Sequence, residues 1–344
     1  MQLSTIRTIY DADGPFATVY LEGRSPAEDA SQQVRLRWDD LRGRLAEAGA
    51  EEDVLEALDS AVIVEDITEV QTDGRVLVAN SSGVLLNAPW DAALGAGDAA
   101  HFSPDAQLGA YVRERDRSAR LLVAIADQTG ATIRRIVSAP QHTLDEREER
   151  DIAATSDESV HKPRQGALSH NQIQRRADEA VKQNARGVAE HLAEISRTWQ
   201  PDLVVLAGEV QGRTALREEL PVVLADITRE VDAGGTDDDA AEEALADALR
   251  ALAGELGEQR TADLTERLEY SRAHNLATEG AAAVARAAQM GAVQTLLLEY
   301  DRPATDEGAL LAAATRIDAE VGVIDTELPD AVAAVLRFEI TEGS

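Results

Sequence analysis

A chain of 344 residues is longer than one hydrophobic core usually organises, so we expect two or three domains. Apolar residues make up 44% of the sequence and aromatic residues 3%, which excludes a disordered chain and predicts cores of Ala, Val, Leu and Ile. The formal net charge is −31, and the absence of cysteine excludes disulfide bonds, thiolate chemistry and zinc sites built from Cys ligands.

Acidic residues outnumber basic ones by 64 to 33. This excess fits a salt-adapted or high-GC proteome as well as any function, because net charge governs solubility and association rather than fold. It argues against a broad nucleic-acid-binding face, so any RNA contact should be local. No stretch is apolar enough to span a bilayer and the start lacks the pattern of a signal peptide, which predicts a cytoplasmic protein without a membrane partner.

The first part of the sequence combines helices with strands. A capped helix begins near Ser25, carries apolar residues at helical spacing and ends at Gly49. A second helix, 51–63, follows at once. Residues 74–80 and 83–88 are then typical of two strands joined in a hairpin.

A second part opens near Arg117 with two apolar strands, 118–126 and 131–139, which predict a sheet with one buried face. Residues 144–160 are charged and poor in apolar side chains, which predicts a mobile loop or a frayed helix. We expect the whole of residues 140–170 to be mobile in the free protein.

A long helix follows over residues 171–199, with an apolar stripe along one side, and Pro201 stops it. Residues 203–208 predict a buried strand, 212–220 a short helix and 221–227 another strand. Strands and helices therefore alternate as in an α/β sandwich.

The remaining sequence follows a linker at residues 232–239. It predicts, in chain order, helices at 239–256, 260–277 and 279–290, a strand at 295–300, a helix at 306–322 and a strand at 331–340.

The fold class predicted from these elements is α/β (α+β), in three domains. Residues 1–115 form an α+β domain, residues 116–232 a middle domain with a basic loop and the long helix, and residues 233–344 a small α/β domain.

Residues 161–183, HKPRQGALSHNQIQRRADEAVKQ, form a locally basic stretch in this acidic chain. They contain both lysines of the protein, Lys162 and Lys182, together with three arginines, Arg164, Arg175 and Arg176. The stretch runs from an irregular loop straight into the long helix. Because Arg and Lys neutralise phosphates and release counterions, the pattern indicates a local anionic partner, with structured RNA as the first to consider.

Each charge also has a plainer interpretation as part of a solvated helix face that pairs with Asp178 or Glu179. Such pairs stabilise a helix by only a few tenths of a kcal/mol. For Arg175 or Arg176 taken singly the two interpretations stay open, whereas the cluster taken together favours RNA.

Other candidate chemistry is weaker. The turn from Gly208 to Thr214 follows a strand and opens a helix, so its amides are candidates for holding a phosphate, but it lacks the spacing of a P-loop and a structural turn explains it as well. We expect His191, within the long helix, to be an interface or core residue. No metal site is expected, because the histidines are scattered: His101, His142, His161, His170, His191 and His274.

Three stretches in this order resemble bacterial and archaeal relatives of class 1 release factors and Pelota: HKPRQGALSHNQIQRRADEAVKQNARGVAEHLAEI, PDLVVLAGEVQGRTALREELP and AAAVARAAQMGAVQTLLLEYD. The chain is similar to the actinobacterial branch that includes the ribosome hibernation factor Balon. The resemblance covers Arg117 to the C-terminus well and the N-terminal domain loosely. It implies a middle-domain loop and helix that reach toward the peptidyl-transferase centre. It also implies a C-terminal domain that resembles RNA-binding ribosomal proteins and docks a translational GTPase.

The sequence departs from the release-factor pattern at two points. No Gly-Gly-Gln tripeptide is present: Gly234-Gly235 is followed by Thr236, and the Gln165-Gly166 pair in the corresponding loop does not recreate that backbone geometry. The lysine-bearing tetrapeptide of stop-codon decoding is also missing, because neither lysine lies in the N-terminal domain. Catalysed peptide release and codon reading by that route are not expected.

The resemblance therefore implies a non-enzymatic, ribosome-binding factor that fills a vacant A site as a hibernation factor, without a cofactor. The alternative is a rescue enzyme, either a peptidyl-tRNA hydrolase or an RNA-cleaving factor, and a further possibility is a regulator that binds another RNA. The expected partners are the 70S ribosome and EF-Tu or another translational GTPase. The residues expected to contact rRNA near the peptidyl-transferase centre are Lys162, Arg164, Gln165, His170, Gln172, Arg175 and Arg176.

Overall fold

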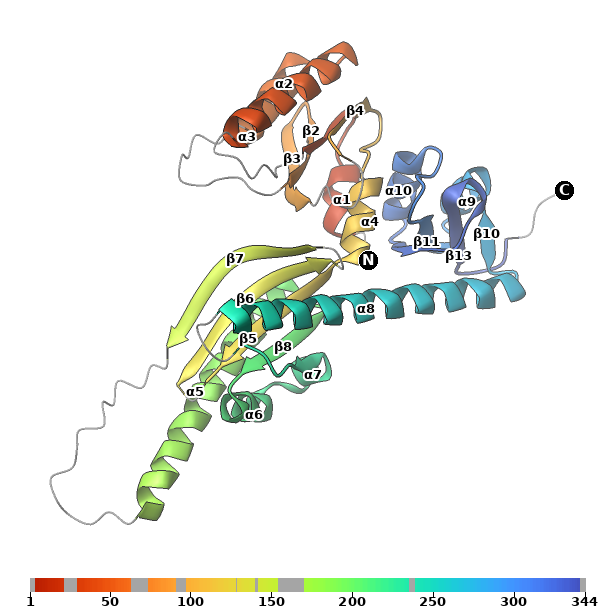
Figure 1. Cartoon of the computed structure of the whole chain (residues 1–344). Coiled ribbons are helices and arrows are strands. Elements are labelled where there is room, and N and C mark those ends of the chain that lie inside the picture. The colour runs from red at the N-terminus through yellow and green to blue at the C-terminus, as the bar shows by residue number, and fades with distance from the viewer. Residues whose placement is uncertain are drawn as a thin grey trace. The chain divides into compact units, whose positions relative to one another are not determined.

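The computed structural model describes residues 4–21, 30–62, 74–90, 97–127, 129–139, 142–153, 170–234 and 239–340. The chain forms two compact units, one made of residues 1–117 and 258–344 and the other of residues 118–257. The described residues contain two four-stranded sheets and one five-stranded sheet, each covered by helices (Figure 1). The predicted mixed α/β fold class is confirmed.

The unit of residues 118–257 is built on the five-stranded sheet, in the order β7-β6-β5-β8-β9. Strand β5 pairs antiparallel with β6 and parallel with β8, and β8 pairs in parallel with β9, so the sheet is mixed. The strands are β5 (Ala119–Ala126), β6 (Gly130–Ala139), β7 (His142–Ala153), β8 (Leu203–Gly208) and β9 (Thr228–Glu230).

Helices cover both faces of this sheet because alternate residues of its central strands point to opposite sides. Leu122 and Leu206 pack in a core with α5 (His170–Trp199), α6 (Val210–Glu219) and α7 (Val222–Asp226). Leu121 and Val205 pack on the other face against the first half of α8 (Asp239–Ala273). The result is a three-layer α/β/α unit.

The unit of residues 1–117 and 258–344 contains an antiparallel sheet near the N-terminus, in the order β3-β2-β1-β4. Its core with α2 and α3 includes Trp38, whose indole Nε1 donates a 2.7 Å hydrogen bond to Asp59. The elements are α1 (Ser4–Tyr10), β1 (Phe16–Leu21), α2 (Ala30–Glu47), α3 (Glu52–Val62), β2 (Gly74–Asn80), β3 (Gly83–Trp90), β4 (Ala99–Ser103) and α4 (Gly109–Arg117).

The same unit contains a mixed sheet near the C-terminus, in the order β10-β13-β11-β12. One face packs against α9 and α10, and Leu268 at the end of α8 packs on the other face. The elements are β10 (Ala277–Glu279), α9 (Ala281–Gln289), β11 (Val293–Glu299), α10 (Glu307–Arg316), β12 (Glu320–Ile324), the 3-10 turn Pro329–Ala331 and β13 (Val332–Leu336).

One continuous apolar core joins these two sheets within the unit. Ile6 and Ile9 of α1 lie in the same buried cluster as Leu310 and Leu311 of α10. The first and last parts of the sequence therefore fold together, although more than a hundred residues of the other unit separate them in the chain.

Several predicted elements are confirmed, among them the hairpin of β2 and β3, the strands β5, β6 and β8, and the helix α5, which ends at Trp199 before Pro201. Others are wrong. Residues 142–153, expected in a loop or frayed helix, form strand β7, and residues 222–226, expected in a strand, form helix α7. Residues 320–322, expected at the end of a helix, belong to strand β12. The two helices expected between residues 239 and 277 are one helix of 35 residues.

Each error has a physical cause. The pairing of β7 with β6 uses backbone hydrogen bonds, and charged residues are common on an edge strand. Val222 and Val223 are exposed, and the strand that pairs with β8 is β9. Residues on both halves of α8 are buried, including Leu249 and Leu268, and this packing outweighs the low helix propensity of Gly254 and Gly257.

The three-domain boundaries stay a prediction. Residues 233–257 lie with the unit of residues 118–257, because Leu245, Leu249 and Ala253 of α8 are buried in its core.

Two glycines allow α6 to approach the carboxyl end of β5. Gly208 has a φ of +92°, and a Cβ added there would lie 2.3 Å from the carbonyl oxygen of Ala126. A Cβ on Gly212 would lie 2.6 Å from the carbonyl oxygen of Asp127. Close backbone packing therefore accounts for both glycines.

Replacing Gly212 with Ala should lower the free energy of unfolding by about 1–3 kcal/mol, because the methyl group has no room beside the Asp127 backbone. Urea unfolding monitored by circular dichroism measures this. The matched control is Gly187→Ala in α5, where a Cβ meets no atom within 4 Å and the change should raise stability by up to about 1 kcal/mol. Equal midpoints for the two variants would contradict the packing argument.

Candidate functional site

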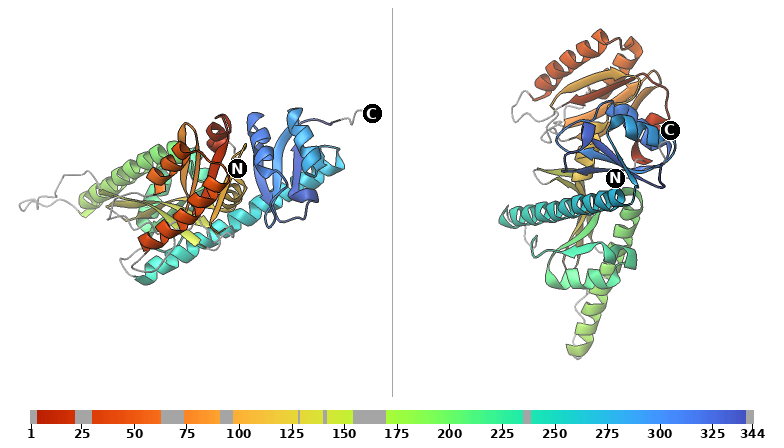
Figure 2. Two further views of the ribbon diagram at one scale, coloured as in Figure 1. Left: turned by 90° about the horizontal axis from the view of Figure 1, so that it is seen from above. Right: turned by 90° about the vertical axis from the view of Figure 1, so that its right-hand side faces the viewer.

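Helix α5 is anchored by its second half. Among its residues whose burial the structure describes, 179–199, the buried side chains begin at Ala185, and Val188, Ala189 and Leu192 continue the apolar stripe against β5, β8 and α6. Glu179 and Ala180 are exposed, and the first turns of the helix extend beyond the sheet (Figures 1 and 2). The beginning of this 30-residue helix therefore projects from its own unit.

The predicted RNA-contact residues divide into two groups. Lys162, Arg164 and Gln165 lie outside the described residues. The structure places the other four in the first two turns of α5, at the projecting end: His170, Gln172, Arg175 and Arg176. Their contact with RNA stays a prediction.

Two further cations on α5 were not among the predicted contacts. Lys182 and Arg186 are each 60% exposed and lie one turn apart. Both reach the carboxylate of Glu219, the last residue of α6, at Nζ–Oε1 and Nε–Oε2 distances of 3.6 and 2.9 Å. The two basic side chains therefore lie next to Ala185, where the buried stripe of α5 begins. One carboxylate, from α6, forms an ion pair with each of them.

The sequence carried a signal for this group, because Lys182 and Arg186 continue the basic stretch at helical spacing. It carried no signal for Glu219, which lies 33 residues beyond Arg186 in the chain. The hydrogen bond from Arg186 lowers the pKa of Glu219, so this carboxylate is charged at neutral pH.

The turn from Gly208 to Thr214, a candidate phosphate site by sequence, has a structural explanation. Its glycines are required by packing against β5, and Arg213 is buried with its Nη1 donating to the carbonyl of Val231 and its Nη2 to Asp232. Glu209 precedes the helix and brings negative charge to its N-terminus. The geometry favours the structural interpretation.

A cleft of about 620 Å³ lies in the unit of residues 1–117 and 258–344. Side chains of β1, β4, α4, the segments before α4 and α10, and the first residue of α10 line it. They include Tyr20, His101, Gln107, Arg113, Tyr300 and Glu307. Burial and the nearby Arg44 lower the pKa of His101, and burial raises the pKa of Tyr20 well above its usual value. His101 and Tyr20 are therefore neutral at physiological pH.

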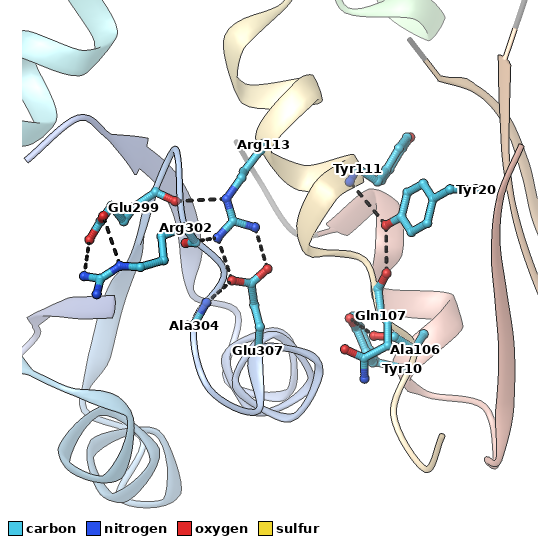
Figure 3. Close-up of polar contacts among 10 residues, drawn as sticks. All are labelled: Tyr10, Tyr20, Ala106, Gln107, Tyr111, Arg113, Glu299, Arg302, Ala304 and Glu307. Carbon is cyan, nitrogen blue, oxygen red and sulfur yellow. Dashed lines mark hydrogen bonds and ion pairs between the residues drawn. The ribbon is translucent and has the colours of Figure 1, made fainter. Parts of the chain in front are cut away.

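A buried ion pair fixes one wall of this cleft. The Nη1 and Nη2 atoms of Arg113 donate to the two carboxylate oxygens of Glu307, both at 2.6 Å, and the Nε atom donates to the carbonyl of Glu299 at 2.9 Å (Figure 3). The two side chains are only 11% and 8% exposed. Gly109 is necessary here, because a Cβ would lie 1.4 Å from Glu307. Both arginines that line the cleft are paired, since Arg302 binds Glu299.

Metal chemistry finds no support in the part of the chain that the structure describes, where no group of three or more His, Cys, Asp or Glu side chains is placed to hold a metal ion. His191 is partly buried, with its Nδ1 atom 3.7 Å from Glu194. Of the helices described, none is both long and apolar enough to cross a bilayer.

The basic stretch and α5 lie in a segment with recognisable relatives. Residues 120–274 match the family model of bacterial archaeo-eukaryotic release factor family 2. For this segment the match confirms the predicted resemblance to release factors.

Two curated relatives cover most of the chain. The uncharacterized proteins Rv2629 and MT2704, from two strains of Mycobacterium tuberculosis, are each 28% identical to it over 313 residues, which are 87% of this chain and 78% of theirs. Among solved structures, a model of ribosome-bound archaeal Pelota and ABCE1 is 15% identical, with a TM-score of 0.42 over 98% of this chain and 95% of its own. Archaeoglobus fulgidus Pelota is 16% identical, with a TM-score of 0.31 over 78% and 80% of the two chains.

The buried ion pair gives a stability prediction. Replacing Arg113 with Met should lower the free energy of unfolding by about 3–5 kcal/mol, because it leaves the buried Glu307 carboxylate without its partner. The control is Arg267→Met, whose pair with Glu320 is half exposed on both sides and should contribute less than about 1 kcal/mol. Urea unfolding measures the free energy of unfolding of the two variants. Similar decreases in both would contradict the prediction that the buried Arg113–Glu307 pair contributes more than the exposed one.

Proposed function

We propose that this protein is a ribosome-binding homologue of translation factors. The observation that carries the proposal is the match of residues 120–274 to a release factor family. This segment contains α5 and the basic residues at its start. An acidic protein that keeps both of its lysines in one basic stretch of the sequence is suited to a local contact with RNA phosphates.

The proposed factor is a binder and not an enzyme. In release factors the Gly-Gly-Gln backbone approaches the tRNA ester, and this sequence has no such tripeptide. Gln165-Gly166 supplies one glycine after the glutamine instead of two before it. Loss of the tripeptide removes the known hydrolytic device and leaves the charge that recognises RNA.

The match to a release factor family and the missing Gly-Gly-Gln tripeptide together lead us to propose a binding site and a delivery partner. The factor occupies the vacant A site of the 70S ribosome in the cytoplasm, as members of the Balon branch do, with its basic segment on rRNA near the peptidyl-transferase centre. EF-Tu or another translational GTPase is the proposed delivery partner. The contacts are those of Lys162, Arg164, Gln165, His170, Gln172, Arg175 and Arg176.

Co-sedimentation with vacant 70S ribosomes over a salt series tests the proposal. We expect saturable binding that weakens as salt rises. Changing Lys162, Arg164, Arg175 and Arg176 together to Ala should weaken it strongly and reduce the slope of log K against log salt by up to about 3, because each lost phosphate contact removes about 0.7. Absence of binding by the wild type, with and without EF-Tu, would reject a ribosomal partner.

Peptidyl-tRNA release separates a binder from a rescue enzyme. Ribosomes that carry peptidyl-tRNA in the P site should release no more peptide with saturating protein than without it. A release factor added to the same complexes is the positive control. Turnover by the purified protein, or cleavage of the RNA, would replace the hibernation proposal by the rescue alternative.

A further inference from the structure

Glu219 occupies an unfavourable position for a carboxylate, and two cations of α5 bind it. It is the last residue of α6, where a carboxylate meets the negative end of the helix dipole and is disfavoured. Its side chain is only 13% exposed, whereas Lys182 and Arg186, which bind it, are each 60% exposed. The two cations compensate for this unfavourable position and keep most of their own surface open to solvent.

The two cations lie on the side of α5 that continues toward its projecting end. Lys182 and Arg186 are four residues apart, and the position of Arg175 is seven residues before Lys182, which is about two helical turns. Residues at these spacings share one side of a helix. A strand of RNA backbone that follows this side from the basic start of α5 reaches Lys182 and Arg186 next.

We propose that Lys182 and Arg186 belong to the RNA-binding face, and that Glu219 is an internal competitor whose carboxylate an RNA phosphate displaces on binding. This inference rests on the proposed function and adds to it a means of limiting affinity. A carboxylate and a phosphate use the same donors of Arg and Lys, so both cannot hold the pair fully at once. The free protein keeps the cations in place through Glu219, and binding exchanges one anion for the other.

Three variants and one matched control test this with vacant 70S ribosomes. Glu219→Gln removes the competitor and should tighten binding about 3- to 10-fold, because the two ion pairs that Glu219 makes with Lys182 and Arg186 no longer have to be broken. Lys182→Ala/Arg186→Ala should weaken binding and reduce the salt slope by about 1.4, for two lost contacts. In that double variant, adding Glu219→Gln should have no further effect.

The control is Glu230→Gln. Glu230 pairs with Arg217, which is 59% exposed and belongs to the same unit, so this change removes the same charge from a comparable pair away from α5. It should leave binding unchanged, which separates a specific exchange from the general effect of one less negative charge. Urea midpoints verify that every variant is folded.

The outcomes distinguish this inference from the function on which it rests. If the wild type binds ribosomes and the double variant binds equally well, or if Glu219→Gln acts to the same extent with and without Lys182 and Arg186, the inference is overturned and the proposed function stands. If the wild type does not bind, both fail. A gain from Glu219→Gln that disappears in the double variant supports the exchange.

Discussion

The anchoring of α5 by one half of its length is the constraint on which the proposed function depends. Leu192 and Val188 are buried against β5 and β8, and the close approach of α6 on this face requires Gly208 and Gly212. A helix held along its whole length would lie flat on the sheet. Because Ala185 is the first buried residue described on it, the helix places its first residue, His170, about 22 Å along its axis from Ala185, and Arg175 and Arg176 about 14 to 15 Å.

That distance matters because the protein carries a net charge of −31. At physiological ionic strength the field of a charged surface decays over about 8 Å, so His170 lies nearly three such lengths from Ala185, and Arg175 and Arg176 nearly two. At these distances screening weakens the repulsion between an RNA phosphate and the acidic residues around the buried half of the helix. An acidic protein can therefore still make a local contact with RNA. The excess of acidic residues remains consistent with a salt-adapted proteome.

Periodicity and composition predicted the elements of the candidate site that are formed by consecutive residues. The apolar stripe of α5, the stop at Pro201 and the buried strand β8 follow from periodicity and composition, and all three are present. What sequence could not supply are pairings between distant segments. Glu307 meets Arg113 across 194 residues, and charged residues buried in this way carry no periodic signal. The same holds for β7, where backbone pairing with β6 decides the structure and the charged side chains suggest a loop.

The position of Glu219 bears on what a reversible ribosome-binding factor requires. Affinity for RNA rises with each cation that reaches a phosphate, and a cluster of this size on one helix can bind too tightly to leave. An internal carboxylate that engages two of the cations lowers the gain from those contacts. It leaves the cations at the projecting end of α5 to steer the first encounter, since electrostatic attraction acts on the association rate and broken close contacts act on the dissociation rate. Glu219 therefore adjusts the lifetime of the complex while the first contact remains fast.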